Sequence, residues 1–227
     1  WEWHVVEGVA AGRANHGSPY SRRRIPDRFF DPITGLSVDG TTEYLDSIVA
    51  SDFGAKASWG KRRVRVHRRG RSSCLWRDKI QMINSVAFSL EKECLLVQVD
   101  ADELWTAEQL VQLRDMFLLE RKGDGGGNCA YFDCHFFVGP DLVTVTEDGW
   151  GHSASNEWLR AWVFRPRESV WLKHAPPELA RHDEATGWML LAGDQCIGRE
   201  ETRERGLVFT HYAYVLEEQV GILAFFW

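Results

Sequence analysis

The sequence predicts an α/β fold with a mixed, mainly parallel central sheet flanked by helices. Up to residue 120, strand-like segments alternate with amphipathic helical segments, as they do in parallel α/β proteins. Apolar residues run almost without interruption from Cys94 to Val99, a pattern typical of a strand buried on both faces. Strand-like segments predominate after the glycine-rich stretch 123–128, so the sheet is expected to be mixed.

Length and charge limit the kind of protein. The chain has 227 residues, for which a single domain is the ordinary expectation. Its formal net charge of −6 argues against general nucleic-acid binding. Lys and Arg are concentrated in residues 61–71, which is either a phosphate-collecting patch or an ordinary solvated edge. No segment approaches the ~20 apolar residues of a membrane span, so no transmembrane segment is expected.

The five cysteines favour a reducing compartment. Their number is odd, and no two of them form a Cys-X-X-Cys pair. Reduced thiols are the rule in the cytosol, and these spacings do not fit a zinc site. We therefore expect free thiols in a cytoplasmic protein, with peripheral association with a membrane as a variant.

The first part of the chain alternates strand and helix signals. A short strand-like segment ends at Glu7 and Gly8, and residues 10–40 are rich in turn formers, as in a long loop. A helix is expected to begin near Asp39, and alternating apolar residues predict a short strand over 64–67.

Two further helices are expected to begin at capping boxes. In this motif a polar side chain caps the helix and a Glu or Gln three residues later caps it in return. Asp78 with Gln81 and Thr106 with Gln109 have this spacing, before and after the apolar strand. Beyond the glycine-rich connector, strands are expected at 130–138, 142–146, 158–164 and 207–214.

The apolar strand ends in the acidic residues Asp100, Asp102 and Glu103. In open α/β sheets ligands bind beyond the carboxyl ends of strands, and carboxylates two apart in extended chain point the same way. Hard oxygen ligands suit Mg²⁺ or Mn²⁺. The alternative is that Asp102 and Glu103 only favour the dipole of the following helix. The position after a buried strand favours a metal that holds a phosphate-bearing substrate.

Together these motifs resemble those of GT-A-fold glycosyltransferases of family 2 and its relatives. The resemblance rests on four segments, with the acidic strand the most specific: Val5–Gly8, Asp78–Asn84, Val97–Glu103 and Thr210–Tyr214. It implies a GT-A-like fold for residues 1–227 as one domain, with a nucleotide-binding part at about 1–120 and an acceptor part at about 121–227. The first strand of such domains is not found, so we expect it upstream of Trp1.

The resemblance also implies roles for individual residues. Glu7, Lys79, Asn84 and Asp100 would contact the nucleotide. Asp100, Asp102 and His211 would bind Mn²⁺ or Mg²⁺, and a neutral imidazole suits Mn²⁺ better. From sequence alone, His211 could equally be a core histidine in an apolar strand.

Two acidic residues are candidates for the general base. An inverting transferase deprotonates its acceptor with a side chain, and related proteins carry this acid after the strands that follow the metal motif. Asp148 is the first candidate and Glu147 the second. The alternative is an acidic turn, because Asp-Gly is a common turn pair.

The implied function is metal-dependent transfer of a sugar from a UDP- or GDP-sugar to a hydroxyl of a glycan or other acceptor. The alternatives are a non-catalytic sugar- or partner-binding module derived from this fold, and a nucleotidyltransferase. A nucleic-acid binder that uses the arginines of residues 61–71 is a further alternative, whose binding would fall steeply with salt.

Overall fold

The predicted mainly parallel central sheet flanked by helices, and with it the GT-A-like architecture, is wrong. In the described residues the strands form small sheets of two, three, four and four strands, and only the two four-stranded sheets mix parallel with antiparallel pairs. The apolar strand β3 (Cys94–Val97) lies at an edge of its sheet and runs antiparallel to β8 (Leu159–Phe164). An apolar run specifies burial, not the direction of the neighbouring strand, and β3 is only half-buried.

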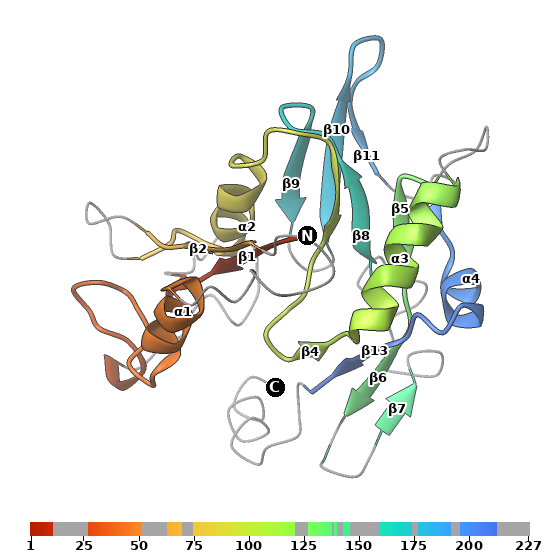
Figure 1. Ribbon diagram of the computed structural model, residues 1–227. Helices are drawn as coiled ribbons and strands as arrows, with labels where there is room; N and C mark the ends of the chain where they lie inside the picture. Colours follow the sequence, from red (N-terminus) through yellow and green to blue (C-terminus); the bar gives the residue numbers. More distant parts are fainter. Residues whose placement is uncertain are drawn as a thin grey trace, which may run out of the picture. The chain divides into compact units, whose positions relative to one another are not determined.

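The computed structural model describes residues 1–10, 27–50, 63–69, 75–120, 127–137, 139, 143–145, 159–173, 177–191 and 196–212. The chain divides into two units, Trp1–Leu90 and Glu91–Trp227. They run from red to yellow and from yellow-green to blue in Figure 1.

The first unit contains a two-stranded parallel sheet and two helices. Strands β1 (Glu2–Val6) and β2 (Arg63–His67) pair in parallel, and the helices are α1 (Thr41–Ala50) and α2 (Lys79–Ala87). Asp78 caps α2 as expected, because Gln81 N donates to Asp78 Oδ1 at 2.7 Å. The return bond of an ordinary capping box is displaced by one residue, since Gln81 Oε1 accepts from Arg77 N at 2.7 Å. The helix start at residue 41 and the strand at 63–67 also agree with the sequence.

Two four-stranded sheets form the body of the second unit. In one, β5 (Cys129–Tyr131) lies between β12 (Cys196–Ile197) and β8, with β3 beyond. The other has the order β4 (Glu103–Leu104), β13 (Phe209–His211), β6 (Cys134–Phe137) and β7 (Val143–Val145). The predicted strand 130–138 is therefore two strands, and the chain changes sheet between them.

An antiparallel meander was not predicted. It consists of β9 (Ser169–Lys173), β10 (Glu178–Asp183) and β11 (Gly187–Leu190). Its inner side is anchored by Trp171, whose ring packs edge-on against that of Trp162 with centroids 4.6 Å apart. The short helix α4 (Arg199–Glu204) was also missed.

The core of this unit lies beneath α3 (Ala107–Glu120), which crosses the sheets in Figure 1. The helix begins at the predicted capping box, with Gln109 N donating to Thr106 Oγ1 and Thr106 N donating to Gln109 Oε1. Residues of its inner face form one buried cluster with residues on and next to the strands: Leu113, Met116, Phe117, Ala130, Phe132, Cys134, Ala161, Val163, Ile197, Leu207 and Phe209.

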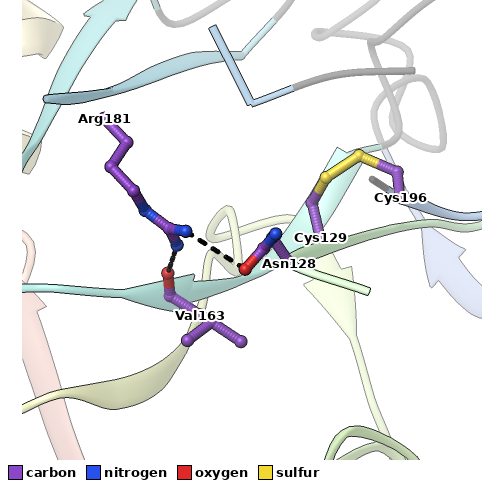
Figure 2. Close-up of a disulfide and its surroundings, with 5 residues drawn as sticks. All are labelled: Asn128, Cys129, Val163, Arg181 and Cys196. Carbon is purple, nitrogen blue, oxygen red and sulfur yellow. Dashed lines mark hydrogen bonds between the residues drawn. A yellow bond between two sulfur atoms is a disulfide. The ribbon is translucent and has the colours of Figure 1, made fainter. Parts of the chain in front are cut away.

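The expectation of free thiols is wrong for two of the cysteines. Cys129 and Cys196, opposite one another on β5 and β12, form a disulfide. Figure 2 shows it next to Asn128, whose Oδ1 accepts from Arg181 at 3.1 Å, and Arg181 also donates to Val163 O at 2.9 Å. The sequence does not reveal this pair, because the number of cysteines is odd and the two residues are far apart in the chain. Pairing of β5 with β12 brings their thiols together. Disulfides are uncommon in cytosolic proteins, so the cytoplasmic location stays a prediction.

Among the described residues, no helix is both long and apolar enough to cross a membrane.

Candidate functional site

The acidic residues after β3 form a tight turn that leads into the second sheet. Glu103 N donates to Asp100 O at 3.0 Å and closes the turn. Glu103 then starts β4, which pairs antiparallel with β13 so that Glu103 lies opposite His211. Just beyond this pair, Tyr212 N donates to Asp102 O at 2.8 Å. Backbone pairing therefore brings the end of β13 to the acidic turn.

Asp102 and His211 meet at this point. The distance from Asp102 Oδ2 to His211 Nε2 is 3.3 Å, with side-chain exposures of 41% and 14%. The ring of Phe136 packs edge-on against the imidazole, with centroids 4.8 Å apart. The histidine is thus held by packing on one side while its Nε2 faces an accessible carboxylate. Two of the three residues assigned to a metal are therefore in contact with each other.

A buried ion pair lies under the same turn. The guanidinium of Arg160, on β8, is 5% exposed and the Glu103 carboxylate is fully buried. Arg160 Nη2 donates to Glu103 Oε1 at 2.6 Å, and Nε donates to Oε1 at 3.0 Å and to Oε2 at 3.2 Å. Such fork-shaped contacts fix the relative orientation of both groups.

The charges of this pair depend on one another. Burial raises the pKa of Glu103, and the adjacent guanidinium of Arg160 opposes that shift. Burial also opposes the charge on Arg160, but the charge and hydrogen bonds of Glu103, together with the charge of Asp100, outweigh it, so the pKa of Arg160 is raised. The contact geometry is that of an ion pair, and either partner alone would be a costly buried charge.

Asp100 contacts this buried pair as well as the turn. Arg160 Nη2 lies 3.5 Å from Asp100 Oδ2, and Gln98 Nε2 donates to Asp100 Oδ1 at 3.2 Å. Asp100 N in turn donates to Glu103 Oε2 at 3.3 Å. The structure thus connects Asp100 to Arg160 and Gln98, whereas Asp102 contacts His211. The predicted sharing of Asp100 between the metal and the nucleotide stays a prediction.

The remaining predicted nucleotide contacts belong to the first unit. Lys79 is exposed at the start of α2, and Asn84 is buried in the same helix. Glu7 is 5% exposed at the end of β1, where Arg68 Nε donates to its Oε2 at 2.7 Å and Thr42 donates to its Oε1. Both Glu7 oxygens therefore hold protein groups together, and its role toward a nucleotide stays a prediction.

The proposed bases Asp148 and Glu147 lie outside the described residues. Arg160 and Gln98 were not predicted from the sequence. A signal for Arg160 existed, because a lone arginine in the apolar strand 159–164 must find a buried acidic partner. The alternative interpretation placed Glu103 near the dipole of the following helix, whereas the structure buries this side chain against Arg160.

The side chains at this site can be compared with the ligands that Mn²⁺ or Mg²⁺ requires. In the parts of the chain that the structure describes, no group of three or more His, Cys, Asp or Glu side chains is arranged to hold a metal ion. One carboxylate and one imidazole nevertheless suit Mn²⁺ or Mg²⁺, which are often bound by few protein ligands together with substrate phosphates and water. The two residues that meet therefore fit a substrate-assisted metal site.

Comparison with known proteins found no matching family model, no matching curated protein and no matching solved structure.

Proposed function

We propose that this chain transfers a sugar from a nucleoside-diphosphate donor to an acceptor hydroxyl, with the help of a divalent cation. The observation that carries the proposal is the 3.3 Å contact of Asp102 with His211. These residues come from two motifs that resemble the metal-binding segments of family 2 glycosyltransferases. The acidic turn and the end of β13 meet through strand pairing, although most of the second unit separates them in sequence.

Glycosyl transfer creates negative charge on the departing diphosphate. A divalent cation, when bound, supplies Lewis-acid stabilisation of that charge. Asp102 and His211 would hold it, because their polar atoms converge and Asp102 is accessible. Phe136 keeps the imidazole in place through ring packing. The acceptor would still need a base, for which Asp148 and Glu147 stay the candidates.

Thermal denaturation with UDP and GDP, each with and without Mn²⁺, tests the proposal. We expect a nucleotide to raise the melting temperature only when Mn²⁺ is present. The stabilisation should reach about 2.7 kcal/mol at a hundredfold excess over the dissociation constant. Release of nucleoside diphosphate from UDP- or GDP-sugars with a glycan acceptor would then identify the transfer. A folded protein that responds to no nucleotide would favour the non-catalytic module, and synthesis of the sugar nucleotide would favour the nucleotidyltransferase.

Asp102→Ala should abolish the Mn²⁺-dependent shift and leave the far-ultraviolet circular dichroism unchanged, because this carboxylate is 41% exposed at the end of a strand. Asp115→Ala is the matched control, since Asp115 is an exposed carboxylate of the same unit that pairs with Arg114 on α3. The control should keep the shift. Unfolding of Asp102→Ala would instead assign Asp102 a structural role.

A further inference from the structure

We propose that Arg160 is a positioning residue: its buried guanidinium fixes the turn from Asp100 to Glu103 so that Asp102 meets His211. The part of this inference that concerns a metal rests on the proposed function. The part that concerns the turn rests on the contacts alone.

The first step is the anchoring of the turn at both ends. Arg160 makes three hydrogen bonds to Glu103 at the end of the turn and lies 3.5 Å from Asp100 at its start. Its backbone adds a further tie, since Gln98 N donates to Arg160 O at 2.8 Å. One side chain from β8 therefore holds both ends of the acidic turn.

The second step follows from the spacing of the three acids. With Asp100 and Glu103 held from below, the intervening Asp102 is the carboxylate that contacts His211. Backbone hydrogen bonds link the same segments as these side chains. Glu103 N donates to Asp100 O within the turn, and Tyr212 N donates to Asp102 O between the turn and the end of β13. These two amides report whether the turn is closed and whether it is docked on the end of β13.

The third step concerns charge. Three carboxylates within four residues repel one another, and a buried guanidinium beneath them offsets that repulsion. Arg160 lies under the turn, on the strand next to β3. Residues that orient metal ligands without touching the ion commonly change affinity by about 10- to 100-fold when replaced. Arg160 has the position that such a residue requires.

The test is hydrogen exchange of backbone amides in the metal-free protein, wild type against Arg160→Met/Glu103→Met. Both partners are replaced because removing one would leave a buried unpaired charge, whereas replacing both with apolar groups is often tolerated. We expect exchange at the amides of residue 103 and Tyr212, each relative to its intrinsic rate, to become about tenfold faster. The amide of Leu110, which donates to Thr106 O at the start of α3, serves as the internal reference and should not change.

Arg181→Met is the matched control. Arg181 is also a buried arginine of this unit, but its guanidinium donates to Asn128 Oδ1 and Val163 O. Its loss should leave both reporter amides as in the wild type. Unchanged exchange at Glu103 and Tyr212 in a folded double variant would overturn the proposal, as would equal acceleration at Leu110, which indicates a general loss of stability.

If the double variant does not fold, the same exchange measurement on Arg160→Lys tests the proposal. A lysine keeps the buried positive charge but cannot make fork-shaped contacts with Glu103 and Asp100 together. Both reporter amides should still exchange faster, by about threefold, with circular dichroism unchanged. Wild-type exchange in this variant would contradict the proposal.

Mn²⁺ titration separates this inference from the proposed function. We expect Mn²⁺ affinity to fall about tenfold in the double variant and to stay unchanged in Arg181→Met. A wild-type protein that binds no Mn²⁺ would end the proposed metal-dependent function, and the exchange rates would still decide the role of Arg160. Wild-type Mn²⁺ affinity in a folded double variant would overturn the metal part of the inference.

Discussion

His4 and His67 form a stacked pair across the parallel strands β1 and β2. The distance from His4 Nδ1 to His67 Nε2 is 2.8 Å, and the ring centroids are 5.1 Å apart. Burial lowers the pKa of His67 below its usual 6.5, and the neighbouring charges of His4 and Arg65 add to the shift. Glu2 also faces this pair, with its Oε2 3.4 Å from His4 Nε2. The folded first unit therefore resists protonation of His67.

Because of His67, we expect the first unit to become less stable in acid. Because its folded pKa lies below the unfolded value of 6.5, the unfolded chain binds more protons as pH falls through 6.5. The contribution of His67 to stability is full above that value and declines until the pH is below the folded pKa. We expect less urea to unfold the first unit at about pH 5 than at about pH 7.5.

His67→Gln should weaken this pH dependence, while His182→Gln, at an exposed position of β10, should keep it. Peptide-resolved hydrogen exchange in urea assigns the effect to the first unit. An unchanged pH dependence in His67→Gln would show that another group is responsible.

The sequence identified part of the candidate site. It predicted that Asp102 and His211 would share a site, and the structure places their polar atoms 3.3 Å apart. It did not predict the buried pair of Arg160 and Glu103, since partners 57 residues apart cannot be matched by local pattern. An arginine in an apolar strand indicates that a buried acidic partner exists, but only the folded structure shows which carboxylate it is.

The helix starts show what local sequence can specify. Asp78 and Thr106 each accept a hydrogen bond from the amide three residues on, as their capping boxes predict. Both interactions involve neighbouring residues, so no long-range information is required. Gln109 has a further role, because its Nε2 donates to Val208 O at 2.7 Å and ties the start of α3 to the approach of β13.

Thr106→Ala should lower the free energy of unfolding of the second unit by about 1 kcal/mol, because a helix amide loses its acceptor. Thr106→Ser retains the hydroxyl and is the control that should stay near the wild type. Urea denaturation followed by circular dichroism measures both. Equal stability of Thr106→Ala and the wild type would mean that Gln109 holds this helix end unaided.

The sequence did not determine whether neighbouring strands run parallel or antiparallel. The apolar runs in β3 and β8 suit burial in either orientation, and the structure pairs them antiparallel. The short strands β5 and β6 appeared as one, because the apolar character continues through Phe132 where the chain changes sheet. Both errors have one cause: the partners that decide pairing are distant in sequence.

The disulfide makes stability depend on redox state in one part of the molecule. Cys129 and Cys196 are 67 residues apart in sequence, and Cys129 is fully buried. In a chain-entropy view, a crosslink over such a loop stabilises the folded state by about 4 kcal/mol. Oxidation is therefore expected to matter to the second unit, which contains both cysteines.

Cys129→Ala/Cys196→Ala should lower the urea midpoint of the second unit and leave that of the first unit unchanged. Non-reducing mass spectrometry first verifies the crosslink in the wild type. Peptide-resolved hydrogen exchange then assigns the change in stability to β5, β12 and their neighbours. Cys94→Ala is a suitable control, since this half-buried cysteine is not part of the disulfide. A loss spread equally over both units would contradict this expectation.

The pairing of β4 with β13 has a consequence for the order of folding. Glu103 and His211 lie opposite one another, yet the strands β5 to β12 and the helices α3 and α4 come between them in the chain. Closing so long a loop is entropically costly, so contacts of this kind form slowly. The Asp102–His211 contact should therefore arise late in refolding, after the local helices. A nascent chain would have its acidic turn long before it had the histidine to complete it, and any activity of this site would begin only when β13 has docked.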